Sequence, residues 1–134
     1  MTLKDLREHV MFQTNNDNDD LGEFQPSLDN YLNEGYDRLV EAYVSGHVGA
    51  TVSGSVPYPL LSSNSDTPKL PSWAHRAIGD YATYCVYRNG NVYKQQRGER
   101  YLQMFYDVLN KLRLLNVDEN GNNVQRHFYN LYTD

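Results

Sequence analysis

Residues 71–114, PSWAHRAIGDYATYCVYRNGNVYKQQRGERYLQMFYDVLNKLRL, contain two helical patterns separated by a turn signal. The first pattern begins near Pro71 or Ser72, because proline is favoured in the first turn of a helix. Its small and apolar residues recur at helical spacing: Ala74, Ala77, Ile78, Tyr81, Ala82 and Cys85. After the turn Asn89-Gly90-Asn91, a second helix is predicted from about Val92 to Leu114. The short connection predicts an antiparallel helical hairpin.

The second helix of this hairpin has the clearest apolar face in the chain. That face consists of Tyr101, Met104, Phe105, Val108, Leu109 and Leu112. Such a stripe on one side of a helix is typical of a core-facing element.

Two further helices are predicted before the hairpin. One runs from Thr2 to about Gln13, with Thr2 as its cap and Asp5 completing a capping box. The other is expected over about Leu28 to Ser45, with Pro26 before it and Ser27 as its N-cap. Its apolar residues again recur at three- and four-residue steps: Leu28, Tyr31, Leu32, Tyr36, Leu39, Val40 and Tyr43. The fold class is therefore mainly α, a bundle of about four helices.

A long central excursion, residues 47–70, interrupts the helical patterns. It is rich in Gly, Ser, Thr and Pro, and Val48, Ala50, Val52 and Val56 alternate with polar residues at the two-residue period of a strand. A single short strand needs a partner, which the same chain or a neighbouring subunit could supply. The stretch Ser62 to Lys69 is expected to be a mobile loop.

The C-terminal residues 116–134 form an extended tail. After the turn signal Asn120-Gly121-Asn122, this tail carries a cluster of aromatic and apolar residues: His127, Phe128, Tyr129, Leu131 and Tyr132. It is too short to bury these side chains by itself, which indicates docking on its own domain or on a partner. We therefore divide the chain into a helical domain, residues 1–115, and a docking tail, residues 116–134.

Composition and charge restrict the function. The chain has 134 residues, the size of one domain, and a net charge of −5, which disfavours binding to polyanions such as DNA or an anionic membrane surface. It has one cysteine, which excludes an intrachain disulfide. No apolar run is long enough to span a membrane, and no signal peptide is recognisable. Its twelve tyrosines suit interfaces as well as cores.

No motif of a known catalytic or cofactor chemistry is present. The sequence lacks phosphate-binding glycine loops and nucleophile elbows. The histidines His9, His47, His75 and His127 have no partner at metal-ligand spacing, and Cys85 on an apolar stripe is interpreted as a buried hydrophobe. We therefore expect no enzyme activity, no cofactor and no metal.

Two charged features have alternative interpretations. The acidic run Asp17-Asn18-Asp19-Asp20 lacks the glutamate that ends a calcium-binding loop, since Leu28 occupies that position, so a solvated loop is favoured. Lys94, Arg97 and Arg100 form a basic ridge at i, i+3 and i+6. The ridge could contact nucleic acid or pair with the acidic second helix of a neighbouring subunit.

The order of these parts resembles the head-to-tail adaptor, or connector, proteins of tailed bacteriophages. The resemblance covers about residues 2–114. It rests on five stretches: Leu3-Lys4-Asp5-Leu6-Arg7, Tyr31-Leu32-Asn33-Glu34-Gly35, Leu70-Pro71, Ala77-Ile78-Gly79-Asp80-Tyr81-Ala82, and the last helix from Phe105 to Leu112. These motifs are patterns of helices and do not include catalytic residues.

The resemblance implies a structural virion protein of the head–tail neck, assembled in the host cytoplasm. Its subunits would form a ring, a dodecamer in this family, that joins the portal protein to the next neck or tail-completion protein. DNA would pass through the channel without specific binding. Val48, Val52, Val56 and Tyr58 would contact a neighbouring subunit or the channel, and the tail residues His127, Phe128, Tyr129, Leu131 and Tyr132 would dock on the portal.

The alternative is a small helical regulatory protein that binds nucleic acid through the ridge Lys94, Arg97 and Arg100. This hypothesis predicts salt-dependent DNA binding, whereas the adaptor hypothesis predicts assembly with copies of the chain and with the portal.

Overall fold

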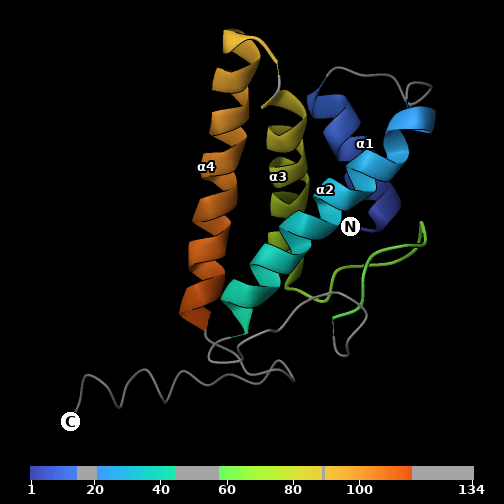
Figure 1. Cartoon of the computed structure of the whole chain (residues 1–134). Coiled ribbons are helices and arrows are strands. Elements are labelled where there is room, and N and C mark those ends of the chain that lie inside the picture. Colours follow the sequence, from blue (N-terminus) through green and yellow to red (C-terminus); the bar gives the residue numbers. More distant parts are fainter. Residues whose placement is uncertain (15–20, 45–57, 89, 116–134) are drawn as a thin grey trace.

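The computed structural model describes residues 1–14, 21–44, 58–88 and 90–115, with the backbone alone for 21–24. Within them, four α-helices follow in the order α1 (Leu3–Gln13), α2 (Leu21–Tyr43), α3 (His75–Tyr87) and α4 (Val92–Leu115). A short 3₁₀ turn, η2 (Ser72–Ala74), precedes α3. The mainly helical bundle expected from the sequence is confirmed. Figure 1 shows α3 beside α4, with α1 on the other side of α3, and α2 crossing α3 obliquely so that its C-terminal end lies near that of α4.

Helix α1 begins as its sequence predicts. The hydroxyl of Thr2 accepts a hydrogen bond from the backbone N–H of Asp5, and the Asp5 carboxylate accepts one from the backbone N–H of Thr2. This reciprocal pair satisfies two donors that a helix N-terminus leaves without partners. The face that carries Leu3, Leu6 and Val10 is fully buried.

Helix α2 corrects the sequence prediction at both ends. It begins at Leu21 rather than at Leu28, contains Pro26 inside the helix, and ends at Tyr43 rather than at Ser45. Ser27 is therefore a helical residue and not an N-cap. A proline so near the start of a helix removes a single backbone bond, to the carbonyl of residue 22, and the helix tolerates this loss.

Helices α3 and α4 form the predicted antiparallel hairpin (Figure 1). The ring of Tyr81 on α3 packs on Phe105 of α4, with 5.0 Å between the ring centroids. Gly98 brings the two backbones close, since a Cβ at this position would lie 3.0 Å from the Cβ of Tyr87. Of the predicted apolar face of α4, Phe105, Leu109 and Leu112 are buried, whereas Met104 is 46% exposed.

Helix α3 is the centre of the core. It packs against α1, α2 and α4, and its stripe of small and apolar residues is buried as predicted: Ala74, Ala77, Ile78, Tyr81, Ala82 and Cys85. Where a neighbouring helix comes closest to α3, one of the two helices needs a small residue. Gly35 of α2 is one such position, because a Cβ there would lie 3.0 Å from the Cβ of Tyr81.

The stretch Ser62 to Lys69 is not the mobile loop that its composition suggested. The carboxylate of Asp66 accepts hydrogen bonds from the backbone N–H groups of Ser62 and Ser63, at 2.8 Å each. The carbonyls of Asn64 and Asp66 then accept hydrogen bonds from the first N–H groups of α1, and the N–H of Lys69 donates to the hydroxyl of Tyr36. The loop therefore serves as a second cap for α1.

A buried ion pair joins α1 to α2 under this loop. Arg7, whose side chain is 6% exposed, donates from Nε and Nη2 to the two carboxylate oxygens of Asp29, at 2.7 and 2.8 Å. Its remaining donor, Nη1, bonds the side-chain oxygen of Asn64. The two partner residues of the guanidinium lie on different segments, Asp29 on α2 and Asn64 in the loop, so the arrangement fixes the loop, α1 and α2 together.

Candidate interaction surfaces

Of the residues predicted to contact a neighbouring subunit or the portal, the structure describes only Tyr58. Val48, Val52 and Val56 lie outside the described residues, and so do the tail residues His127, Phe128, Tyr129, Leu131 and Tyr132. Tyr58 is described and is 4% exposed, as a member of the hydrophobic core. It therefore packs within its own chain rather than on an open surface.

The two undescribed segments adjoin the same end of the bundle. Residues 45–57 follow the C-terminal end of α2, and residues 116–134 follow the C-terminal end of α4. These two helix ends lie together at one end of the bundle in Figure 1.

A groove of about 650 Å³ lies between α2 and α4. This α2–α4 groove is lined by Arg38, Glu41, Ala42, Tyr106, Leu109, Asn110 and Arg113. Tyr106 is an exposed aromatic residue of α4. Leu114 and Leu115, in the last turn of the same helix, are exposed aliphatic residues. Aromatic and aliphatic side chains surrounded by charges of both signs are typical of protein–protein interfaces.

A polar cluster joins this groove to the interior through Arg38. The hydroxyl of Tyr81 donates to Glu34 at 2.5 Å, and Glu34 also accepts from Arg38 at 3.4 Å. The guanidinium of Arg38 lies over the ring of Tyr81, 5.3 Å from its centroid. Burial, together with the hydrogen bond to Glu34, raises the pKa of Tyr81. Glu34 thus orients Tyr81 and Arg38.

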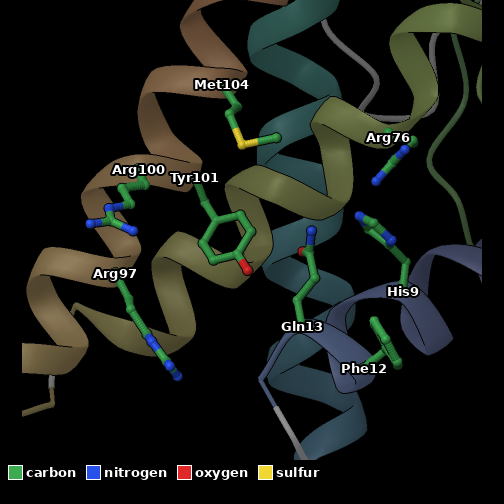
Figure 2. Close-up of a pocket in the computed structure, with 8 residues that line it drawn as sticks. All are labelled: His9, Phe12, Gln13, Arg76, Arg97, Arg100, Tyr101 and Met104. Atoms are coloured by element: carbon green, nitrogen blue, oxygen red, sulfur yellow. The ribbon is translucent and has the colours of Figure 1, made fainter.

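A second groove, of about 570 Å³, lies where α1, α3 and α4 meet. Figure 2 shows Arg97, Arg100, Tyr101 and Met104 reaching it from α4, Arg76 from α3, and His9, Phe12 and Gln13 from α1. We call it the cationic groove. Phe12 is 82% exposed, although it is one of the largest apolar side chains of α1.

A hydrogen-bond network connects the cationic groove to buried polar residues of α3. Gln13 donates to the carboxylate of Asp80 at 3.0 Å and accepts from the hydroxyl of Thr83 at 2.6 Å. Nε2 of His9 lies 3.5 Å from the same Asp80 oxygen. Asp80 and Thr83 are buried, so this network fixes the side chains of His9 and Gln13 relative to α3.

The basic ridge predicted from the sequence continues the cationic groove along α4. Lys94, Arg97 and Arg100 together line a third hollow of about 430 Å³, with Tyr93 beside them. Arg97 and Arg100 line both hollows. The periodicity of α4 was enough to find the ridge, but Arg76 and Phe12 join it only through packing between helices.

The histidine and cysteine that the sequence offered for chemistry are structural. His75 is buried, with Nε2 2.9 Å from the carbonyl of Leu70 and Nδ1 2.9 Å from the amino nitrogen of Met1. Cys85 is a buried free thiol, and burial raises its pKa. In the described part of the chain, no three His, Cys, Asp or Glu side chains are placed to hold a metal ion. Nor does any helix of that part have the length and apolarity to cross a membrane.

The chain matches no protein-family model, and comparisons with curated proteins and with solved structures gave no match.

Proposed function

We propose that this chain is a head-to-tail adaptor of a tailed bacteriophage, a structural protein of the virion neck that assembles in the host cytoplasm. Copies of it form a ring around the DNA channel and join the portal protein to the next protein of the neck or tail. The order of its helices supports this proposal, because it agrees with the pattern on which the resemblance to adaptor proteins rests.

The single observation that carries the proposal is the composition of one end of the bundle. The α2–α4 groove, the exposed side chains of Leu114 and Leu115, and the helix ends that precede residues 45–57 and 116–134 adjoin one another there. The hydrophobic core of the described residues does not include Tyr106, Leu114 or Leu115. Exposed apolar residues that the core does not use mark a surface for assembly.

The charges of the α2–α4 groove favour a protein partner. Arg38 and Arg113 lie beside Glu41, so the groove offers cations and a carboxylate at short separation. A polyanion would be repelled by the carboxylate, whereas another protein surface can pair with both signs. A second copy of the chain carries both signs as well, and a head-to-tail contact between copies closes into a ring by rotation.

Within this proposal, Val48, Val52 and Val56 contact the neighbouring subunit or the channel, and the tail from His127 to Tyr132 docks on the portal. Tyr58 is no longer assigned to the subunit contact, because its side chain is buried in its own chain. The contact surface contributed by the bundle is instead the α2–α4 groove with Leu114 and Leu115.

The test is the assembly state of the purified full chain over a range of concentrations, by native mass spectrometry and negative-stain imaging. We expect closed rings at high concentration. Tyr106→Asp and Leu114→Asp place a charge in the proposed contact and are expected to prevent ring formation, with unchanged circular dichroism. Phe12→Asp places the same charge on an exposed aromatic residue of the other groove and serves as the matched control that retains assembly.

Two results would contradict the proposal. One is a chain that stays monomeric at all concentrations and in mixture with the portal protein encoded in the same genome. The other is a gene that lies in no cluster of portal, capsid and tail genes, because a neck protein is expected to be encoded between them.

A further inference from the structure

The cationic groove and the basic ridge form one continuous surface with a single sign of charge. We call it the cationic strip: Arg76, Lys94, Arg97 and Arg100, with His9 at its edge. Among the described residues, no carboxylate lies within 4.0 Å of these four cations, since the ion pairs found there join Arg7, His9 and Arg38 to acids. Asp80, the acid beside His9, is buried and lines neither hollow.

The net charge of −5 does not cancel this strip. Charges on a protein surface are screened over about 8–10 Å at physiological salt, so the local groups decide what binds at one place. Lys94, Arg97 and Arg100 follow one another at three-residue steps and therefore extend over about 9 Å of helix α4. Their side chains can reach successive charges of an elongated anion.

Aromatic side chains lie beside these cations: two are largely exposed, and the third, Tyr101, is half-buried with its ring 6.4 Å from that of Tyr87. Phe12 and Tyr93 are 82% and 80% exposed, at opposite ends of the strip, and Tyr101 lies between them on α4. Exposing rings of this size is unfavourable, and a flat ring next to an arginine offers a surface on which a planar group can stack.

We propose that the cationic strip binds single-stranded nucleic acid without sequence preference. The cations neutralise phosphates of the backbone, and Phe12, Tyr93 and Tyr101 stack on bases. Stacking distinguishes a single strand from a duplex, because the faces of paired bases are covered by their neighbours. This proposal is independent of the adaptor function, since it uses another face of the bundle and requires no assembly.

The experiment measures binding of the full chain to a fluorescent oligothymidine of about 12 nucleotides by anisotropy, at low salt. The same measurement is made with a duplex of equal length and with a polyglutamate peptide. If about four phosphates are neutralised, log K falls with log salt with a slope of about −3. We expect the single strand to bind at least tenfold more tightly than either alternative.

Two variants locate the site. Arg97→Glu with Arg100→Glu is expected to weaken binding more than a hundredfold, and Tyr93→Ser is expected to weaken it about tenfold with an unchanged salt slope. Lys111→Glu is the control, because Lys111 is an exposed cation of the same helix that lines neither the strip nor the α2–α4 groove. It should change the affinity less than threefold.

Several results would overturn the proposal. The first is no binding of the single strand at low salt, and the second is equal or tighter binding of the duplex or of polyglutamate. The third is an equal loss of affinity in the Lys111→Glu control and in the strip variant. Retention of ring assembly in the strip variant would show separately that the adaptor function does not depend on this surface.

Discussion

Arg7 is the residue on which the packing of α1 depends most. Its guanidinium is buried and bonded to Asp29 on α2 and to Asn64 in the loop. Arg7→Met would leave the carboxylate of Asp29 without its cation, and removing one member of a buried pair costs about 3 kcal/mol. We expect urea unfolding to show a loss of this size, against less than about 0.5 kcal/mol for the exposed control Arg113→Met. A loss below about 1 kcal/mol in Arg7→Met would contradict a buried ion pair between Arg7 and Asp29.

His75 should make stability depend on pH. Burial lowers its pKa and the nearby amino terminus adds to this effect, whereas hydrogen bonding to the backbone of Leu70 and of Pro68 opposes it. The unfolded chain therefore takes up the proton first, at a pKa of about 6.5. The free energy of unfolding is therefore unaffected by the titration of His75 above that pH and decreases as the pH falls below it.

The measurement is the free energy of unfolding at pH 7.5 and at pH 5.5, for the wild type and for His75→Gln. Glutamine can still donate to the carbonyl of Leu70 but does not titrate in this range. The wild type should lose more stability on acidification than the variant. Equal losses in the two proteins would exclude His75 as the cause.

At this scale, the sequence predicted local chemistry and missed distant pairs. The capping box of Thr2 and Asp5 was predictable, because its two residues are three positions apart. The partners of Arg7 are far along the chain, and nothing in a single sequence indicates which carboxylate an arginine will find. The same holds for the contact of His75 with the amino group of Met1.

At the scale of elements, the loop 58–71 depends on Asn33 of α2. The side chain of Asn33 donates to the carbonyl of Leu61 at 3.0 Å and accepts from its N–H at 2.9 Å. Asn33→Ala should therefore speed hydrogen exchange at the Leu61 amide and destabilise the chain by about 1–3 kcal/mol. Asn30→Ala, at an exposed position of the same helix, should do neither. Unchanged exchange at Leu61 in Asn33→Ala would show that these bonds do not hold the loop.

The same loop explains why element prediction failed where it did. Residues 62–69 are polar and rich in turn-forming types, which favours a mobile segment, yet Asp66 caps the turn and Asn33 and Tyr36 bind its backbone. Composition gives the number of polar groups in a segment but not their partners. The start of α2 was misplaced for a related reason, because Pro26 was given its commonest position and the helix tolerates it elsewhere.

At the scale of the whole molecule, the described helices should fold without the tail. In the described part of the chain, every buried polar side-chain atom has a hydrogen-bond partner, and the core extends from Leu3 to Leu112. A chain ending at residue 115 is therefore expected to keep its thermal unfolding temperature within a few degrees. The measurement is thermal unfolding followed by circular dichroism. Loss of cooperative unfolding would show that residues 116–134 belong to the core instead.

The candidate surfaces could be predicted only in part. The ridge Lys94, Arg97 and Arg100 followed from helical periodicity within one element. The addition of Arg76 and Phe12, and the groove between Tyr106 and Glu41, depend on how helices pack against one another. Periodicity shows which face of a helix is polar, but not which other helix adjoins that face.

The central claim, assembly through the end of the bundle where α2 and α4 terminate, is tested most directly by hydrogen exchange of the full chain. The exchange of dilute monomer is compared with that of assembled rings. We expect added protection in peptides that cover residues 38–57 and 106–115, and none in α1 or α3. Protection that is unchanged at that end, or that rises only over the face carrying Phe12 and Arg97, would contradict the claim.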